Sequence, residues 1–170
     1  MKSIVAILAI CLTWAMAGAA EQGGGPSDAQ IAAIVVTANQ VDIDAGTLAK
    51  SKAQSPQVRE FAQLMITDHT GVNKAATELV ERLHVTPVPS ATSESLQKGG
   101  DENLAALKKL SGAAFDKAYI NHEVAYHEAV LSAMDKTLIP SAQNAELKAL
   151  LVKVPRSSPT WTMPSACRLS

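Results

Sequence analysis

Two histidines on apolar helix faces are the residues of this sequence with the clearest chemical potential. His69 and His127 each fall among apolar residues spaced three or four apart, which is the helical period. Glu123 precedes His127 by four residues and therefore shares its helix face. Asp42 belongs to an earlier helical segment and can face the same interior. Asp42, His69, Glu123 and His127 are therefore the candidate ligands of one transition metal ion, which the two histidines would hold together with one or two of the carboxylates.

The residue types limit which metal such a site would take. Imidazole and carboxylate ligands suit zinc, copper or iron, and Met65 near His69 favours copper because a thioether is a soft ligand. A ferritin-type di-metal site uses Glu-x-x-His motifs, and Glu123 and His127 are one residue too far apart for that motif. Under the alternative interpretation, the histidines only form hydrogen bonds with carboxylates in a packed core.

Composition indicates one all-α domain. The chain has 170 residues with 29 alanines and 4% aromatic residues, a balance that favours helices over strands. Its 15 basic and 16 acidic residues give a net charge of −1, so no nucleic-acid partner is expected. The sequence contains neither a G-x-S-x-G turn nor a phosphate-binding glycine loop, so we predict no catalytic residues and no organic cofactor.

The helical pattern predicts four main helices, over residues 28–53, 56–83, 113–138 and 142–154. Ser27 and Gln30 form an expected capping box, and Ser141 is the expected cap of the last helix. Residues 85–100, with two prolines and the Gly99-Gly100 pair, are expected to be a long connection, followed by a short helix over 101–110. Four helices with one long crossover indicate a ferritin-like bundle, in which the last helix is truncated.

The N-terminal residues are typical of an export signal. Lys2 is the only charged residue before Glu21, an apolar segment follows it, and small residues end the segment at Ala19-Ala20. We predict a signal peptide over 1–20, a flexible linker over 21–26 and the bundle over 27–154. The mature protein would then lie in the periplasm without a transmembrane segment, at most peripherally associated with the outer membrane.

Residues 155–170 do not continue the helical pattern. The segment PRSSPTWTMPSACRLS has three prolines and no helical period. Read two bases later, its codons can encode ALVAHLDHA, which would complete an amphipathic helix. We hypothesise that a frameshift replaced the true end of the last helix; the alternative is a genuine irregular tail.

Two segments carry a family resemblance, VDIDAGTLAKSKAQSPQVREFAQLMITDH and LSGAAFDKAYINHEVAYHEAV. They resemble bacterial exported ferritin-like proteins of unknown function, often labelled outer-membrane proteins. The matching residues include Val58, Met65 and Asp68-His69, and then Phe115-Asp116, Tyr119 and His127. Asp42 stands where that family typically has glutamate. The resemblance implies a ferritin-like fold and an exported location, and it implies no established reaction.

These observations favour a non-enzymatic protein of the cell envelope that binds a partner protein or a small ligand, or that acts under stress. The alternative function is metal binding by the His and carboxylate residues, with redox activity as one outcome.

Overall fold

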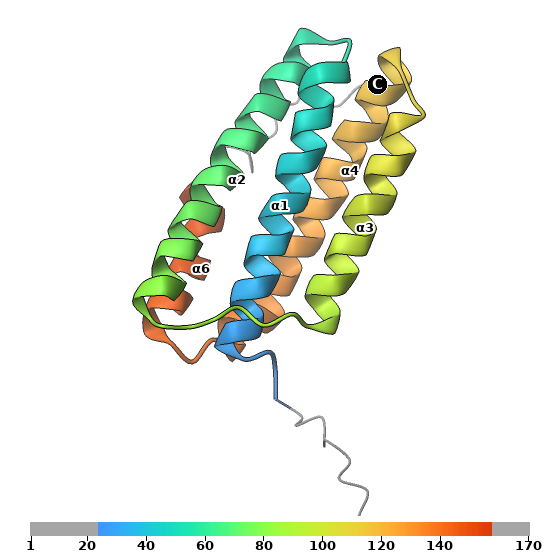
Figure 1. Cartoon of the computed structure of the whole chain (residues 1–170). Coiled ribbons are helices and arrows are strands. Elements are labelled where there is room, and N and C mark those ends of the chain that lie inside the picture. Colours follow the sequence, from blue (N-terminus) through green and yellow to red (C-terminus); the bar gives the residue numbers. More distant parts are fainter. Residues whose placement is uncertain (1–23, 158–170) are drawn as a thin grey trace, which may run out of the picture.

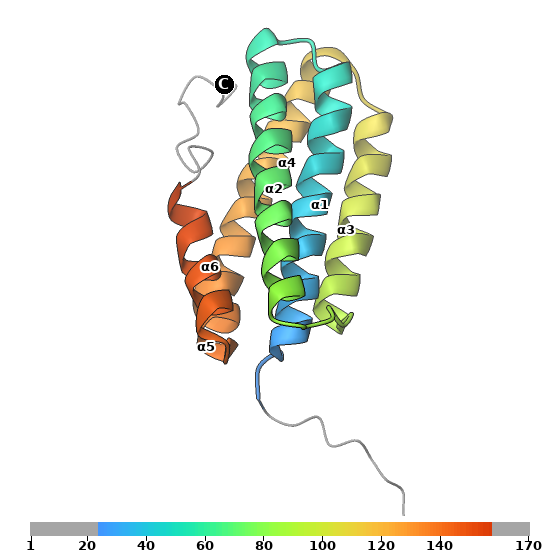
Figure 2. The same ribbon diagram turned by 60° about the vertical axis from the view of Figure 1, so that its left-hand side comes forward.

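The computed structural model describes residues 24–157, and these are helical with no strand among them. The prediction of an all-α chain is confirmed for this part. The helices lie side by side and reverse direction at each connection along the chain (Figures 1 and 2). The expected signal peptide and residues 158–170 of the expected irregular tail lie outside the described residues.

Helices α1 (Asp28–Lys52) and α2 (Pro56–Arg82) form an antiparallel hairpin. The expected capping box is confirmed: Gln30 N donates to Ser27 Oγ at 3.3 Å, and Ser27 N donates to Gln30 Oε1 at 3.0 Å. Asp116 stabilises the turn between the two helices, because its carboxylate accepts hydrogen bonds from Gln54 N at 2.9 Å and Ser55 N at 2.8 Å. Asp116 belongs to α4 (Gly112–Ala133), so a side chain of α4 satisfies two backbone donors just before α2.

Helix α3 (Ala91–Lys108) differs from the sequence prediction. The prediction of a connection over 85–100 is wrong from residue 91 onward, since Gly99 and Gly100 lie inside an 18-residue helix. The connection is short, and one capping box, formed by Ser90 and Ser93, begins the helix. Close packing explains why residue 100 is glycine, because a Cβ there would lie 2.7 Å from Val41 Cγ2. Glycine thus allows α3 to approach α1 closely.

The C-terminal helices continue further than predicted. Helix α4 (Gly112–Ala133) passes into the π-helix η1 (Met134–Leu138) and the short α5 (Ile139–Ser141), so the chain stays helical through Pro140. Helix α6 (Ala145–Ser157) has 13 residues and is shorter than the long helices, as expected, although it ends three residues later than expected. Asn144, not Ser141, caps it, since its Oδ1 accepts from Glu146 N at 2.9 Å.

Two hydrophobic clusters occupy opposite ends of the helical body. The first cluster lies near the α1–α2 turn and includes Phe61, Met65, Leu107, Phe115 and Tyr119. The second cluster lies near the start of α1 and the end of α4, and consists of Ile31, Ile34, Leu79, Met134, Leu138, Ala142, Leu147 and Leu151. The buried polar residues Asn39, Asp42, Glu123 and His127 belong to neither cluster.

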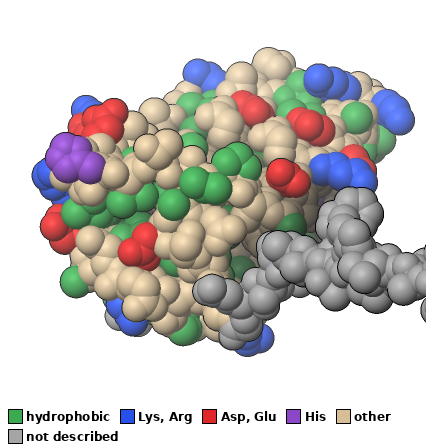
Figure 3. Space-filling view, turned by 60° about the horizontal axis from the view of Figure 1, so that its bottom comes forward, with side chains coloured by type: hydrophobic (Ala, Val, Ile, Leu, Met, Phe, Trp, Pro, Cys, Tyr) green, Lys and Arg blue, Asp and Glu red, His purple; other side chains and the backbone are tan. Residues whose placement is uncertain are grey.

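The described surface gives little sign of a dedicated charged or membrane-spanning region. On the face shown in Figure 3, acidic and basic side chains are interspersed, with small groups of hydrophobic side chains between them. Within residues 24–157, none of the helices combines the length and apolar character that crossing a membrane requires.

Candidate metal centre

Three helices bring three ligand-type atoms together near the middle of the body. His69 Nε2 on α2 lies 3.4 Å from Asp42 Oδ2 on α1, and His127 Nε2 on α4 lies 4.0 Å from the same oxygen. The two Nε2 atoms are 3.4 Å apart. Each residue thus contributes one potential ligand atom, and all three atoms lie within 4.8 Å of one another. The geometry allows a single ion to contact all three.

Hydrogen bonds at the Nδ1 atoms of His69 and His127 determine which nitrogen of each ring carries the proton. Asn39 Nδ2 donates to the Val35 carbonyl at 2.7 Å, which leaves Asn39 Oδ1 to accept from His69 Nδ1 at 2.6 Å. His127 Nδ1 donates to the Glu123 carbonyl at 2.8 Å. Because both acceptors are oxygens without a proton, each neutral ring carries its proton on Nδ1 and leaves a lone pair on Nε2. Metal-bound histidines in proteins are oriented by this kind of bond.

The separations between the three atoms fit a shared cation better than direct hydrogen bonds. Distances of 3.4 and 4.0 Å exceed the usual range of about 2.5–3.2 Å for hydrogen bonds. With metal–ligand bonds of about 2.0–2.2 Å, tetrahedral ligands lie about 3.4 Å apart. Two of the three separations match that value, and a small side-chain rotation would shorten the third. With Asp42 ionised, a cation between these three atoms would offset the repulsion among their lone pairs.

Burial keeps both histidines neutral. Burial, and to a smaller extent the neighbouring His127, lower the pKa of His69 to about 4. Burial also lowers the pKa of His127, against the hydrogen bond to the Glu123 backbone, which raises it. Burial raises the pKa of the Asp42 carboxyl well above its usual value. A divalent ion would favour ionised Asp42, since a nearby positive charge stabilises a carboxylate.

Glu123 is beside the three converging atoms and not among them. Its Oε2 lies 3.8 Å from His127 Nδ1, the ring nitrogen on the other side from the convergence. The side chain is completely buried and lies next to the Asp42 carboxyl group. Burial raises the pKa of Glu123 well above its usual value, and the neighbouring Asp42 carboxylate raises it further. This environment favours a neutral carboxylic acid next to the centre.

Met65, Tyr119 and Tyr126 have roles in packing. Met65 is fully buried in the first cluster, which gives it a packing role. Tyr119 belongs to the same cluster, and burial raises its pKa. Tyr126 is half-buried and its hydroxyl donates to the Ala38 carbonyl at 3.1 Å, which ties α4 to α1 beside the centre.

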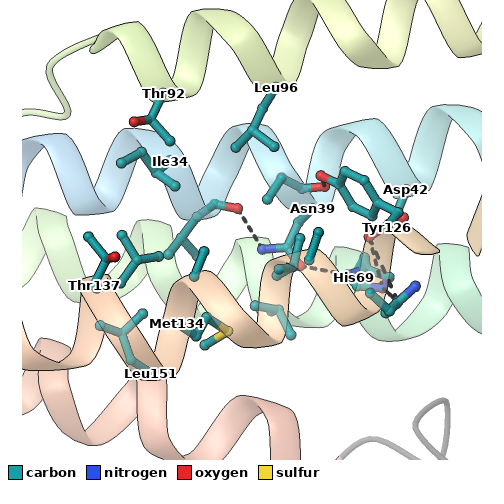
Figure 4. Close-up of a pocket in the computed structure, with 18 of the residues that line it drawn as sticks. Ile34, Asn39, Asp42, His69, Thr92, Leu96, Tyr126, Met134, Thr137 and Leu151 are labelled. Atoms are coloured by element: carbon teal, nitrogen blue, oxygen red, sulfur yellow. Dashed lines mark hydrogen bonds and ion pairs between the residues drawn. The ribbon is translucent and has the colours of Figure 1, made fainter. Parts of the chain in front are cut away.

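A cavity of about 400 Å³ opens from the centre toward the second cluster. Asp42, His69 and His127 all contribute to its wall, so the candidate centre adjoins the cavity. In Figure 4, Asn39, Asp42, His69 and Tyr126 lie at one end, and mostly apolar side chains extend from them. An ion held by these three residues would lie beside this space.

The sequence predicted the ligand candidates of the centre and missed the residues that support them. The structure brings Asp42, His69 and His127 together as ligand candidates and places Glu123 next to His127. Asn39 and Tyr126 were not predicted to take part. Asn39 precedes Asp42 by three residues on one helix, so a helical-face argument finds it. The cavity depends on the packing of helices far apart in sequence, and no local pattern indicates it.

The fold and the centre define a helical protein with a candidate His/carboxylate metal site between its helices. A family model described as "Domain of unknown function (DUF4142)" matches residues 14–156, and the chain belongs to this family. Comparisons with curated proteins and with solved structures found no match.

Proposed function

We propose that this protein binds one transition metal ion through Asp42 Oδ2 and the Nε2 atoms of His69 and His127. The observation that carries the proposal is the convergence of these three atoms, with both imidazole protons held on the opposite nitrogens. Near-tetrahedral separations and nitrogen–oxygen ligands favour zinc. Three protein ligands leave a fourth position open, as in zinc sites that bind a water molecule or a substrate.

The proposal includes a ferritin-like four-helix bundle in the periplasm. Carboxylate and imidazole side chains that point inward from α1, α2 and α4 support this classification, since ferritin-like bundles build metal sites in this way. The pattern of residues 1–20 supports export. The sequence resemblance supports loose association with the outer membrane, and a role under stress would use an apolar patch exposed on the bundle.

Binding of a small ligand, the other function that the sequence predicts, is favoured by the cavity. The cavity and the three converging atoms are adjacent, so the two functions do not compete for different parts of the molecule. A metal ion at the polar end and a ligand along the apolar walls would occupy one continuous site.

Calorimetric titration of the metal-free protein with zinc tests the proposal, with elemental analysis of the dialysed complex. We expect one equivalent of zinc. His69→Asn should weaken zinc affinity at least 100-fold, because it removes one of three ligands. His84→Asn is the matched control: His84 is exposed, away from the cavity, and has a φ of 54° that asparagine tolerates. Less than a tenth of an equivalent bound, or equal affinities for the two variants, would refute the proposal.

A further inference from the structure

We propose that the cavity binds an amphiphile with an apolar chain and a carboxylate head, and that a carboxylate oxygen occupies the open coordination position of the metal. This inference rests on the proposed metal site. It goes further by naming the chemical class of the ligand and the orientation in which it lies.

The first argument is the shape of the cavity and the distribution of polarity along it. Its volume of about 400 Å³ lies within the range of about 300–1,000 Å³ that is common for small-molecule sites. Polar groups gather at the end formed by Asp42, His69 and His127. The remaining wall is largely aliphatic and includes Ile34, Leu96, Val130 and Leu151. An occupant that matches this wall has a polar group at one end and an apolar chain behind it.

The second argument is charge. A divalent metal ion held by one carboxylate and two neutral imidazole ligands has a net charge of +1 in a largely apolar surrounding. A buried uncompensated charge is costly, and a carboxylate head would neutralise it. The residues that line the cavity include no lysine or arginine. The metal is therefore the only positive charge in the lining available to an acidic head, whereas a cationic head would be repelled.

The third argument is the route for the chain. Thr92 on α3 and Thr137 on η1 line the end away from Asp42 and are exposed (Figure 4). Helix α6 closes one side with Leu150 and Leu151. A head group at the metal would therefore place the apolar chain between α1, α4 and α6, with its end directed toward the exposed threonines.

The test uses cobalt(II) as a spectroscopic substitute for zinc and decanoate as the probe. Cobalt titration first establishes whether one equivalent of metal binds. Decanoate is then added to the cobalt-loaded and the metal-free protein, with decanol as the uncharged probe of similar length. We expect decanoate to change the visible cobalt spectrum and to bind at least tenfold more tightly with metal than without. Decanol should bind at least tenfold more weakly than decanoate to the cobalt-loaded protein.

The outcomes separate the two proposals. No cobalt binding overturns the proposed metal site and this inference with it. Cobalt binding with an unchanged spectrum at saturating decanoate overturns the inference alone. Equal affinities for decanoate and decanol, or for loaded and metal-free protein, also overturn it.

A pair of variants tests the position of the chain. Leu96→Phe enlarges a side chain on α3 that lines the cavity, and Leu104→Phe makes the same change on α3 outside the cavity. We expect Leu96→Phe to weaken decanoate binding at least tenfold while cobalt affinity stays within twofold. Leu104→Phe should leave both affinities within twofold of the original protein. Unchanged decanoate affinity in Leu96→Phe would place the chain elsewhere and contradict the inference.

Discussion

The two hydrophobic clusters are built on the same long helices and differ in how fully they are packed. In the first cluster, Phe115 and Tyr119 are completely buried, and none of its buried members lines the cavity. In the second cluster, Ile34, Met134, Leu138 and Leu151 form part of the cavity wall. Asp42 and His69 lie at the polar end of the cavity (Figure 4), and His127 adjoins His69 there.

Local sequence features explain the difference. At the first cluster, α1 presents Ala45 and Ala49 and is followed by Ala53, and a Cβ on Gly46 would lie 3.0 Å from the Ala62 carbonyl oxygen. Small residues thus allow α1 and α2 to approach closely around the aromatic rings. At the second cluster, α4 widens into the π-helix η1, and such irregular turns frequently occur at functional sites. The comparison teaches that one end provides rigidity while the other provides space beside the candidate centre.

The largest expected effect comes from a matched pair of leucines. Leu107 in the first cluster and Leu151 in the second are both 1% exposed. We expect Leu107→Ala to lower the free energy of unfolding by about 4 kcal/mol, and Leu151→Ala by about 2 kcal/mol. Leu151 borders the cavity, so its side chain has fewer contacts to lose. Chemical denaturation measures both values, and equal losses would contradict the difference in packing.

The second prediction concerns the pH dependence of stability in metal-free protein. The folded pKa of His69, about 4, is below the unfolded value of 6.5, so between these pH values only the unfolded state binds this proton. The stability contributed by His69 is therefore lost as pH falls from 6.5 to 4. Relative to His69→Gln, the original protein should gain up to about 3 kcal/mol as pH rises through this window.

Denaturation curves of the two proteins at several pH values measure this difference. A charged His69–Asp42 ion pair would raise the pKa of His69 and reverse the sign of the slope. A difference that stays constant or falls as pH rises would therefore contradict a neutral, metal-competent His69.

The smallest effects are expected at two neighbouring glycines of α3. Gly100→Ala places a Cβ 2.7 Å from Val41 Cγ2, and we expect a net loss of about 1–2 kcal/mol. Gly99 has no atom within 4 Å of a Cβ, so Gly99→Ala should stabilise by about 0.5–1 kcal/mol through helix propensity. Thermal unfolding of both variants measures these opposite signs. A stabilising Gly100→Ala would mean that α3 does not pack closely on α1 at this point.

Local patterns predicted most helices and the residues of the candidate centre. The periodic spacing around His69 and His127 was sufficient to place them on interior faces, and Ser27 with Gln30 indicated the start of α1 correctly. A helix over 101–110 was expected, and the first part of α3, residues 91–100, was missed because Gly99 and Gly100 have poor helix propensity. The close contact of Gly100 with Val41 requires glycine there. The π-helix and the cavity could not be predicted, because both depend on packing between segments far apart in the chain.

The central claim is that His69 and His127 direct unprotonated Nε2 atoms toward Asp42. Nitrogen–proton correlation NMR of the histidine rings, near neutral pH and without metal, measures it most directly. We expect both rings to carry their proton on Nδ1, and one equivalent of zinc to shift both Nε2 resonances. A proton on Nε2 of either ring, or Nε2 resonances that zinc leaves unchanged, would contradict the claim.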